Sequence, residues 1–257
     1  MITSTSNPRV QWVRTLQNKR RARQRENLFI IEGARLVNEA ISSLSPAKLV
    51  LYTDALEQDD QRLIDELINL GAEAEMVSEQ VMKACSDTES PQGLLAVLPL
   101  PFSAPPDNLT LALVADRISD PGNLGTILRT ALAAGVEAVF INTGTVDPFN
   151  PKVVRGAMGA HFHLPIIQVQ ISEIEKHLRG IEIWVAEAGL GPPYYDVDWN
   201  KPSAIVIGSE AHGPSDEFRS IAKGSTHIPM QDLAESLNAS VAAAVILFEI
   251  ARRRGEE

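Results

Sequence analysis

Short apolar runs alternate with stretches of helical periodicity along most of this chain. In the first hundred residues, the runs at 28–31, 49–52, 74–77 and 94–98 predict strands, and the stretches near 33–43, 57–70 and 78–84 predict helices. This order is typical of a small α/β unit.

A proline-rich segment then interrupts the pattern. Four prolines fall within 99–106, where they disrupt the regular hydrogen bonding of the backbone. The segment 99–108 therefore predicts a linker between a front domain, 1–98, and a larger second domain, 109–257.

The second domain repeats the alternation of strands and helices. Strands are predicted at 109–115, 138–142, 164–169, 181–186 and 204–208, and helices near 123–134, 151–158, 172–179 and 236–253. Such an alternation predicts a parallel sheet covered on both faces, with ligands bound beyond the carboxyl ends of its strands. The loops after the strands are therefore the segments in which to look for chemistry.

The loop after the first of these strands leads into a helix that carries one arginine. Pro121 and Gly122 predict the turn, Asn123 is predicted to cap the helix, and Arg129 follows about two turns later. For Arg129 alone, a solvent-facing role is the commoner interpretation, although a planar guanidinium also suits phosphate.

The loop after the strand at 204–208 contains two glycines and an acid. Gly208 and Gly213 permit close approach of the backbone to a ligand, and Glu210 would project into the crevice. Taken alone, this motif is weak and is also consistent with a tight strand-to-helix turn in which Ser215 caps the next helix.

The start of the last predicted helix has more polar residues than capping requires. Asp232, Glu235, Ser236 and Asn238 precede it, where the first backbone N–H groups have no partner within the helix. One such side chain would suffice as a cap, so the others are candidates for a site.

Several common sites are not predicted. Neither loop contains the glycine pattern of a dinucleotide fold or a P-loop, which argues against those enzyme classes. His161 and His163 have no evident third ligand, so we interpret them as structural and predict no metal. Cys85 is the single cysteine and cannot form an internal disulfide.

Charge is distributed unevenly. The net charge is −10, which disfavours a polyanionic partner, but residues 1–25 carry +7 without a single acid and leave −17 for the rest. Arg20, Arg21 and Arg23 lie in this basic arm, which is either a segment that contacts the phosphates of a nucleic acid, or a solvated helix face or ordered terminus. No apolar run approaches the roughly 20 residues of a membrane span and no signal sequence is evident, so we expect a cytoplasmic protein.

Three segments, in this order, resemble the motifs of the SpoU (TrmH-like) family of ribose 2′-O-methyltransferases, in the knotted SPOUT class. They are Asn123-x5-Arg129, the loop Gly208-Ser209-Glu210-x-x-Gly213, and the run from Ile228-Pro229-Met230 to Ser236-Leu237-Asn238 with its helix of small residues. Residues 143–160 also resemble the family, and 29–37 with 92–97 are similar to its ribosomal-protein-like RNA-binding domain.

The resemblance implies a fold, a donor and a set of site residues. It implies a deep trefoil knot in the second domain, S-adenosylmethionine as methyl donor, RNA as substrate and a homodimer. Residues matching the donor site are Gly208, Ile228, Leu237, Thr143, Gly144 and Met230, and those matching the catalytic site are Asn123, Arg129, Glu210, Ser236 and Asn238.

The implied reaction needs alignment of a ribose hydroxyl and removal of its proton, without a metal. Because a guanidinium is a poor base, we expect Arg129 to bind phosphate and stabilise the developing alkoxide rather than to take the proton. The expected substrate is ribosomal RNA. Transfer RNA remains an alternative, as does a catalytically silent ribosome factor of the same fold.

Overall fold

The computed structural model describes residues 1–56, 58–101, 103–209, 211–231 and 236–255. The chain divides into two compact units. The first comprises residues 1–101 and 149–162, and the second comprises 102–148 and 163–257. No helix among the described residues is long and apolar enough to cross a membrane.

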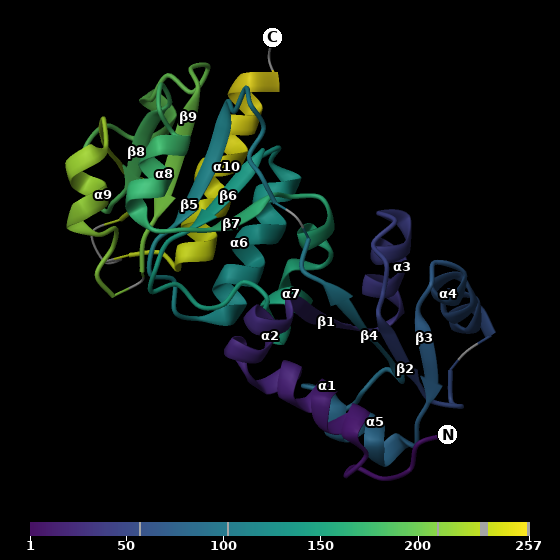
Figure 1. The fold of residues 1–257 in the computed structure, drawn as a ribbon. Helices are drawn as coiled ribbons and strands as arrows, with labels where there is room; N and C mark the ends of the chain where they lie inside the picture. Colours follow the sequence, from purple (N-terminus) through teal and green to yellow (C-terminus); the bar gives the residue numbers. More distant parts are fainter. Residues whose placement is uncertain (57, 102, 210, 232–235, 256–257) are drawn as a thin grey trace. The chain divides into compact units, whose positions relative to one another are not determined.

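The first unit is built on a mixed four-stranded sheet (Figure 1). Strand β4 lies between β1 and β2 and is antiparallel to both, while β2 and β3 are parallel. Its elements are α1 (Pro8–Asn18), α2 (Arg20–Glu26), β1 (Leu28–Glu32), α3 (Ala34–Ser42), β2 (Leu49–Tyr52), α4 (Gln58–Asn69), β3 (Glu73–Met76), α5 (Glu79–Cys85), β4 (Leu94–Pro99), α7 (Pro151–Ala157) and the 3₁₀ turn η1 (Ala160–Phe162).

Residues 149–162 pack in this unit because they carry aromatic rings into its core. The Phe149 ring meets Phe29 of β1 edge-on, with 5.4 Å between ring centroids, and the buried His161 ring stacks on Phe29 at 6.2 Å. This segment was predicted to belong to the second domain. Sequence periodicity identifies its helix but carries no information on which core that helix joins.

The second unit is built on a six-stranded sheet in the order β10-β8-β9-β5-β6-β7. All its strand pairs are parallel, which confirms the predicted sheet. Its elements are β5 (Leu111–Ala115), α6 (Pro121–Ala133), β6 (Ala138–Ile141), β7 (Ile166–Gln168), α8 (Ile171–His177), β8 (Glu182–Ala186), the 3₁₀ turn η2 (Tyr194–Asp196), β9 (Ser203–Ile207), α9 (Asp216–Ile221), β10 (Gly224–Thr226) and α10 (Ala239–Gly255).

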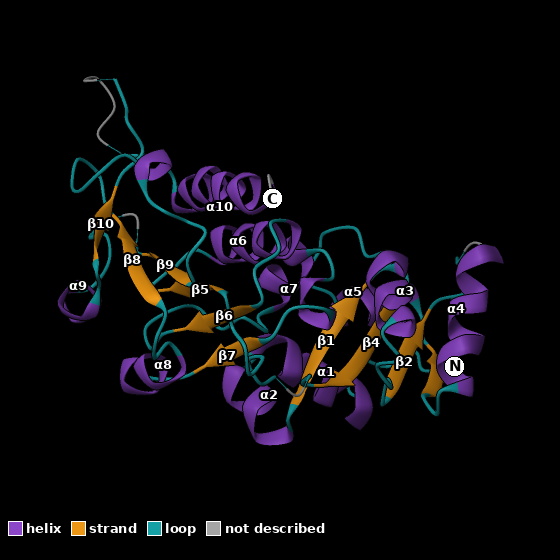
Figure 2. Cartoon of the chain, turned by 90° about the horizontal axis from the view of Figure 1, so that it is seen from above, coloured by secondary structure: helices purple, strands orange, loops and turns teal. Residues whose placement is uncertain are grey.

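Helices cover both faces of this sheet. Figure 2 shows α6 and α10 on one side and α8 and α9 on the other. The strands accordingly read as continuous apolar runs, and β5 and β9 are buried at every position. This arrangement leaves the carboxyl ends of the strands as the edge where loops gather.

The last helix is fastened at its end by one arginine. The Arg254 guanidinium donates to the carbonyl oxygens of Trp199, Lys201 and Thr110, at 2.8 to 3.0 Å. These carbonyls lie at or just before the amino ends of β9 and β5. Arg254 therefore fixes the end of α10 at the sheet edge opposite the site.

Candidate active site

A pocket of about 280 Å³ lies beyond the carboxyl ends of β8, β9 and β10. Its lining residues are Ala186, Glu187, Ala188, Ile207, Gly208, Ser209, His212, Gly213, Thr226, His227, Ile228, Met230, Ser236, Leu237, Ala239, Ala242 and Ile246. The first residues of α10 form an apolar wall, and the three strand ends supply polar groups. A concave site of this kind suits a small organic ligand with both apolar and polar parts.

Four of the six predicted donor-site residues line this pocket: Gly208, Ile228, Met230 and Leu237. Thr143 and Gly144 do not. They follow β6, which β5 separates from β9 and β8, and Gly144 packs against the Arg117 side chain instead. The sheet order thus explains why this pocket and the loop at 143–144 are separate.

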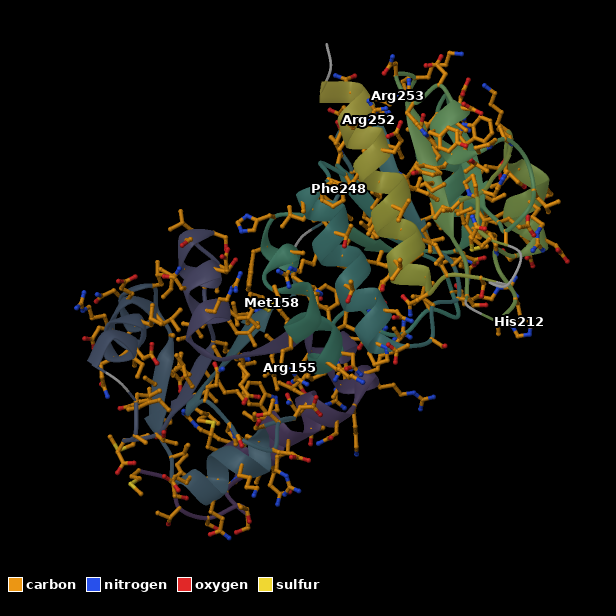
Figure 3. The ribbon with its side chains drawn as sticks, turned by 180° about the vertical axis from the view of Figure 1, so that it is seen from behind. Arg155, Met158, His212, Phe248, Arg252 and Arg253 are labelled. Atoms are coloured by element: carbon orange, nitrogen blue, oxygen red, sulfur yellow. The ribbon has the colours of Figure 1, made fainter. Side chains whose placement is uncertain are left out.

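The loop after β9 closes tightly on itself. A Cβ atom placed on Gly208 would lie 2.1 Å from the Gly213 carbonyl carbon, so a side chain at this position would displace the loop. The Gly213 amide donates to the Ser209 carbonyl oxygen at 2.8 Å, and Gly213 has a φ of +65°. His212, labelled in Figure 3, lies on this loop and lines the pocket.

Two predicted catalytic residues are joined by a hydrogen bond. Asn238 Nδ2 donates to Asn123 Oδ1 at 3.0 Å, across 115 residues of sequence. Asn238 Oδ1 in turn caps α10, because it accepts from the Ser240 and Val241 amides. Asn238 therefore has both the ordinary capping role and a partner from the first motif.

The predicted cap of α6 was assigned to the wrong residue. Asp120 is the N-cap, and its Oδ1 accepts from the Asn123 amide at 2.8 Å. Pro121 then occupies the first helical position, for which its fixed φ is suited. This shift places Asn123 in the first turn, where its side chain meets Asn238.

A buried carboxylate connects the loops that follow β5, β6 and β9. Asp116 is fully buried, and it accepts from Asn142 Nδ2 at 2.7 Å and from the Ser215 amide at 2.7 Å. A buried acid needs such partners to offset the loss of hydration. Ser215 was considered as a side-chain cap of α9, but its side chain makes no capping bond; its amide binds Asp116 instead.

The remaining predicted residues differ in their surroundings. Ser236 lines the pocket, and Arg129 lies exposed on α6, two turns after Asn123. Glu210 lies outside the described residues, as do Asp232 and Glu235.

The basic arm forms α1 and α2, and its arginines are not equivalent. Arg20 and Arg21 are exposed, whereas Arg23 is 3% exposed and donates to the carbonyl oxygens of Leu16 and Gln17 at 2.6 and 3.1 Å. The inclusion of Arg23 among the RNA-binding residues was therefore wrong: its guanidinium ties the end of α1 to α2. The run of basic residues in the sequence did not show that Arg23 is buried while Arg20 and Arg21 are exposed.

Sequence reasoning also missed pocket residues that the structure supplies. Thr226 lies on β10, a strand of three residues that is too short for a periodic signal. Glu187 follows directly after the predicted strand at 181–186, and the rule that led to Glu210 after β9 would have found it.

Together, the fold and the pocket define an α/β protein with a pocket for a small ligand at the strand ends of one unit and with a second compact unit. The profile of the SpoU rRNA Methylase family matches residues 110–248, and that of the MRM3-like substrate binding domain matches residues 7–96. The chain belongs to the SpoU rRNA methylase family, as the three motifs indicated.

Individual relatives match nearly the whole chain. The 23S rRNA (guanosine(2553)-2′-O)-methyltransferase RlmP of Bacillus subtilis is 34% identical, over 97% of this chain and 98% of the relative. The crystal structure of AviRb from Streptomyces viridochromogenes with AdoMet superposes with a TM-score of 0.88, at 27% identity over 98% of this chain and 100% of that one. The crystal structure of the AdoMet-bound rRNA methyltransferase from Sinorhizobium meliloti superposes with a TM-score of 0.88, at 28% identity over 98% of this chain and 97% of that one.

Proposed function

We propose that this protein transfers a methyl group from S-adenosylmethionine to a ribose 2′-hydroxyl of ribosomal RNA. One observation carries the proposal: the hydrogen-bonded side-chain amides of Asn123 and Asn238 lie at the start of α10. The first residues of this helix form a wall of the donor pocket. Relatives named as rRNA 2′-O-methyltransferases and structures that contain AdoMet support the reaction and the donor.

The pocket residues fit this donor. Leu237, Ala242 and Ile246 offer an apolar surface to a purine, and the strand-end loops offer backbone groups and polar side chains. When bound, the donor supplies a methyl group on a sulfonium centre that is already a good leaving group. The chain's tasks are then to hold the ribose in line and to stabilise the charge on its oxygen.

Arg129 is the proposed group for the target nucleotide. Its exposed guanidinium carries five donors in one plane, which suits a phosphate and a developing alkoxide. A hydrogen bond joins the side-chain amides of Asn123 and Asn238, and this pair forms the polar border of the reaction site. Ser236, at the edge of the pocket, can accept or donate a hydrogen bond there.

The first unit is the proposed RNA-binding unit, in line with its match to a substrate binding domain. Exposed Arg20 and Arg21 would contact the phosphate backbone and make affinity depend on salt. We further propose that the second unit contains the trefoil knot of its class and that the protein acts in the cytoplasm.

A homodimer is also proposed, with α10 at its centre. Val241 is 47% exposed and Phe248 52%, and they lie on one face of the helix because they are seven residues apart (Figure 3 labels Phe248). Exposed apolar side chains in register on one helix favour burial against a second copy. Sedimentation of Phe248→Glu should show monomers where the wild type shows dimers, whereas Leu44→Glu, an exposed control in the first unit, should leave the dimer intact.

Methyl transfer from radiolabelled donor to total RNA, followed by mapping of the modified nucleotide, tests the function. We expect label at one ribose of ribosomal RNA. Label in transfer RNA would identify the alternative substrate, and RNA binding without transfer would identify a silent factor. A methyl group found on a base rather than a ribose would refute the proposed chemistry.

A further inference from the structure

One wall of the donor pocket carries a carboxylate to which the proposed chemistry gives no role. Glu187 follows β8, lines the pocket, and has a side chain that is only 17% exposed. A partly buried acid in a ligand pocket needs either a structural or a binding explanation.

The structural explanation accounts for one of its two oxygens. Arg219 of α9 donates to Oε1 through both Nε, at 3.1 Å, and Nη2, at 2.8 Å. Among the described residues, Oε2 accepts only from the Ser225 hydroxyl, at the long distance of 3.4 Å. Since each carboxylate oxygen can accept about two hydrogen bonds, Oε2 keeps acceptor capacity.

Two polar neighbours of Glu187 in the pocket, Thr226 and His227, already form hydrogen bonds with the chain. Thr226 Oγ1 donates to the Pro192 carbonyl oxygen at 3.0 Å, and His227 Nδ1 is bonded to the Gly191 carbonyl oxygen at 3.1 Å. Glu187 is thus a strong acceptor in the pocket that still has a position for a ligand.

The ion pair between Glu187 and Arg219 determines which kind of ligand group Glu187 can bind. The guanidinium of Arg219, 2.8 Å from the carboxylate, offsets the negative charge of Glu187. Glu187 therefore offers a ligand hydrogen-bond acceptors rather than a net negative charge. Such a group suits neutral hydroxyls better than a further cation. A carboxylate at a strand end holds ribose hydroxyls in the same way in dinucleotide-binding sheets.

We propose that Glu187 binds the 2′,3′-diol of the donor's adenosine and that Arg219 acts as its positioning residue. The inference rests on the proposed function, because it takes this pocket as the S-adenosylmethionine site. It adds a determinant of donor binding directly after β8, outside the three motifs of the family.

Titration calorimetry with S-adenosylhomocysteine and its 2′-deoxy and 3′-deoxy analogues tests this assignment. Loss of a hydrogen bond to a charged acceptor costs about 1.5–3 kcal/mol, so the wild type should bind at least one deoxy analogue roughly 10- to 100-fold more weakly than the parent. In Glu187→Ala the parent should weaken to the level of that analogue, and the ratio should fall to within about threefold.

Two further variants serve as controls for an indirect effect of the substitution on the fold. Glu187→Gln keeps the size of the side chain and should lose part of the discrimination. Glu182→Gln removes an ion-paired carboxylate on β8 that is bonded to Lys223 at 2.6 Å and lies outside the pocket lining, and this variant should keep the wild-type ratio.

The possible outcomes separate the two proposals. If Glu187→Ala weakens all ligands equally and keeps the ratio, the residue is only structural and the inference is wrong. If it instead abolishes discrimination against an analogue without the α-amino group, the carboxylate binds the ammonium group and the inference is also wrong. If the wild type binds none of these ligands, the donor assignment itself fails, and the inference with it.

Discussion

Asn238 both caps α10 and pairs with Asn123, and different substitutions should remove these two roles separately. Its Oδ1 accepts from the Ser240 and Val241 amides at 2.9 and 3.4 Å and caps α10, while its Nδ2 binds Asn123 Oδ1 at 3.0 Å. Loss of a cap to alanine costs about 1 kcal/mol, and loss of an exposed hydrogen bond costs about 0.5 kcal/mol. Asn238→Ala should therefore lower the free energy of unfolding by about 1–2 kcal/mol, and the melting temperature by roughly 2–8 °C.

Asn238→Ser should keep most of this stability because serine caps helices about as well as asparagine. Its shorter side chain has no amide nitrogen with which to reach Asn123. Asn123→Ala removes the other half of the pair and leaves the cap in place. Thermal unfolding followed by circular dichroism, together with single-turnover methyl transfer at saturating donor, measures both properties.

All three variants should lose most methyl transfer, but only Asn238→Ala should lose clearly in stability. Activity close to wild type in Asn238→Ser would show that residue 238 serves only as a cap. Full activity in Asn123→Ala would show that the amide pair is dispensable. Either result would refute the assignment of this pair to the reaction site.

Three further measurements test the assignments of charged groups. Arg129→Lys keeps the charge but loses the planar fork, so single-turnover transfer should fall roughly 10- to 100-fold; near-normal transfer would disprove bidentate positioning. Arg20→Ala/Arg21→Ala should weaken RNA binding and flatten its salt dependence without changing donor affinity, and unchanged RNA binding across a salt series would exclude this arm. Glu249 accepts hydrogen bonds from Arg252, which lower its pKa from 4.5 to about 2, so its contribution to stability is complete above pH 4.5 and is lost as the pH falls toward 2. Denaturation of Glu249→Gln and wild type should therefore differ at pH 7 and converge near pH 2; a gap that stays constant would contradict this origin.

The sequence was sufficient for most strands and helices and for much of the pocket, but α1, α2 and the short strand β10 were not predicted. Gly208, Ile228, Met230, Leu237 and Ser236 were expected at a site from their resemblance to the family motifs, and they line one cavity. Parallel strands deliver the loops that follow them to one edge of the sheet, which brings such residues together. Sheet order, by contrast, is a long-range property that periodicity does not encode. The sheet order separates Thr143 and Gly144 from the pocket beyond β8, β9 and β10.

Burial was the second property that local patterns did not reveal. Arg23 has the same chemistry as Arg20 and Arg21, but only a view of its neighbours shows that it binds the carbonyl oxygens of Leu16 and Gln17. Segment 149–162 likewise joins the first unit through Phe149, whose partner Phe29 is far away in sequence. Such partners are defined by the assembled core.

The hydrogen bonds of Asp116 also have a consequence for the time course of folding. Its partners are 26 residues away at Asn142 and 99 residues away at Ser215, so each bond closes a loop of a very different length. Because closing the longer loop costs more conformational entropy, we expect the bond to the Ser215 amide to form after the bond to Asn142, together with the pairing of β9 beside β5. A nascent chain that stops short of Ser215 therefore lacks one of the two hydrogen-bond donors that hold this buried carboxylate.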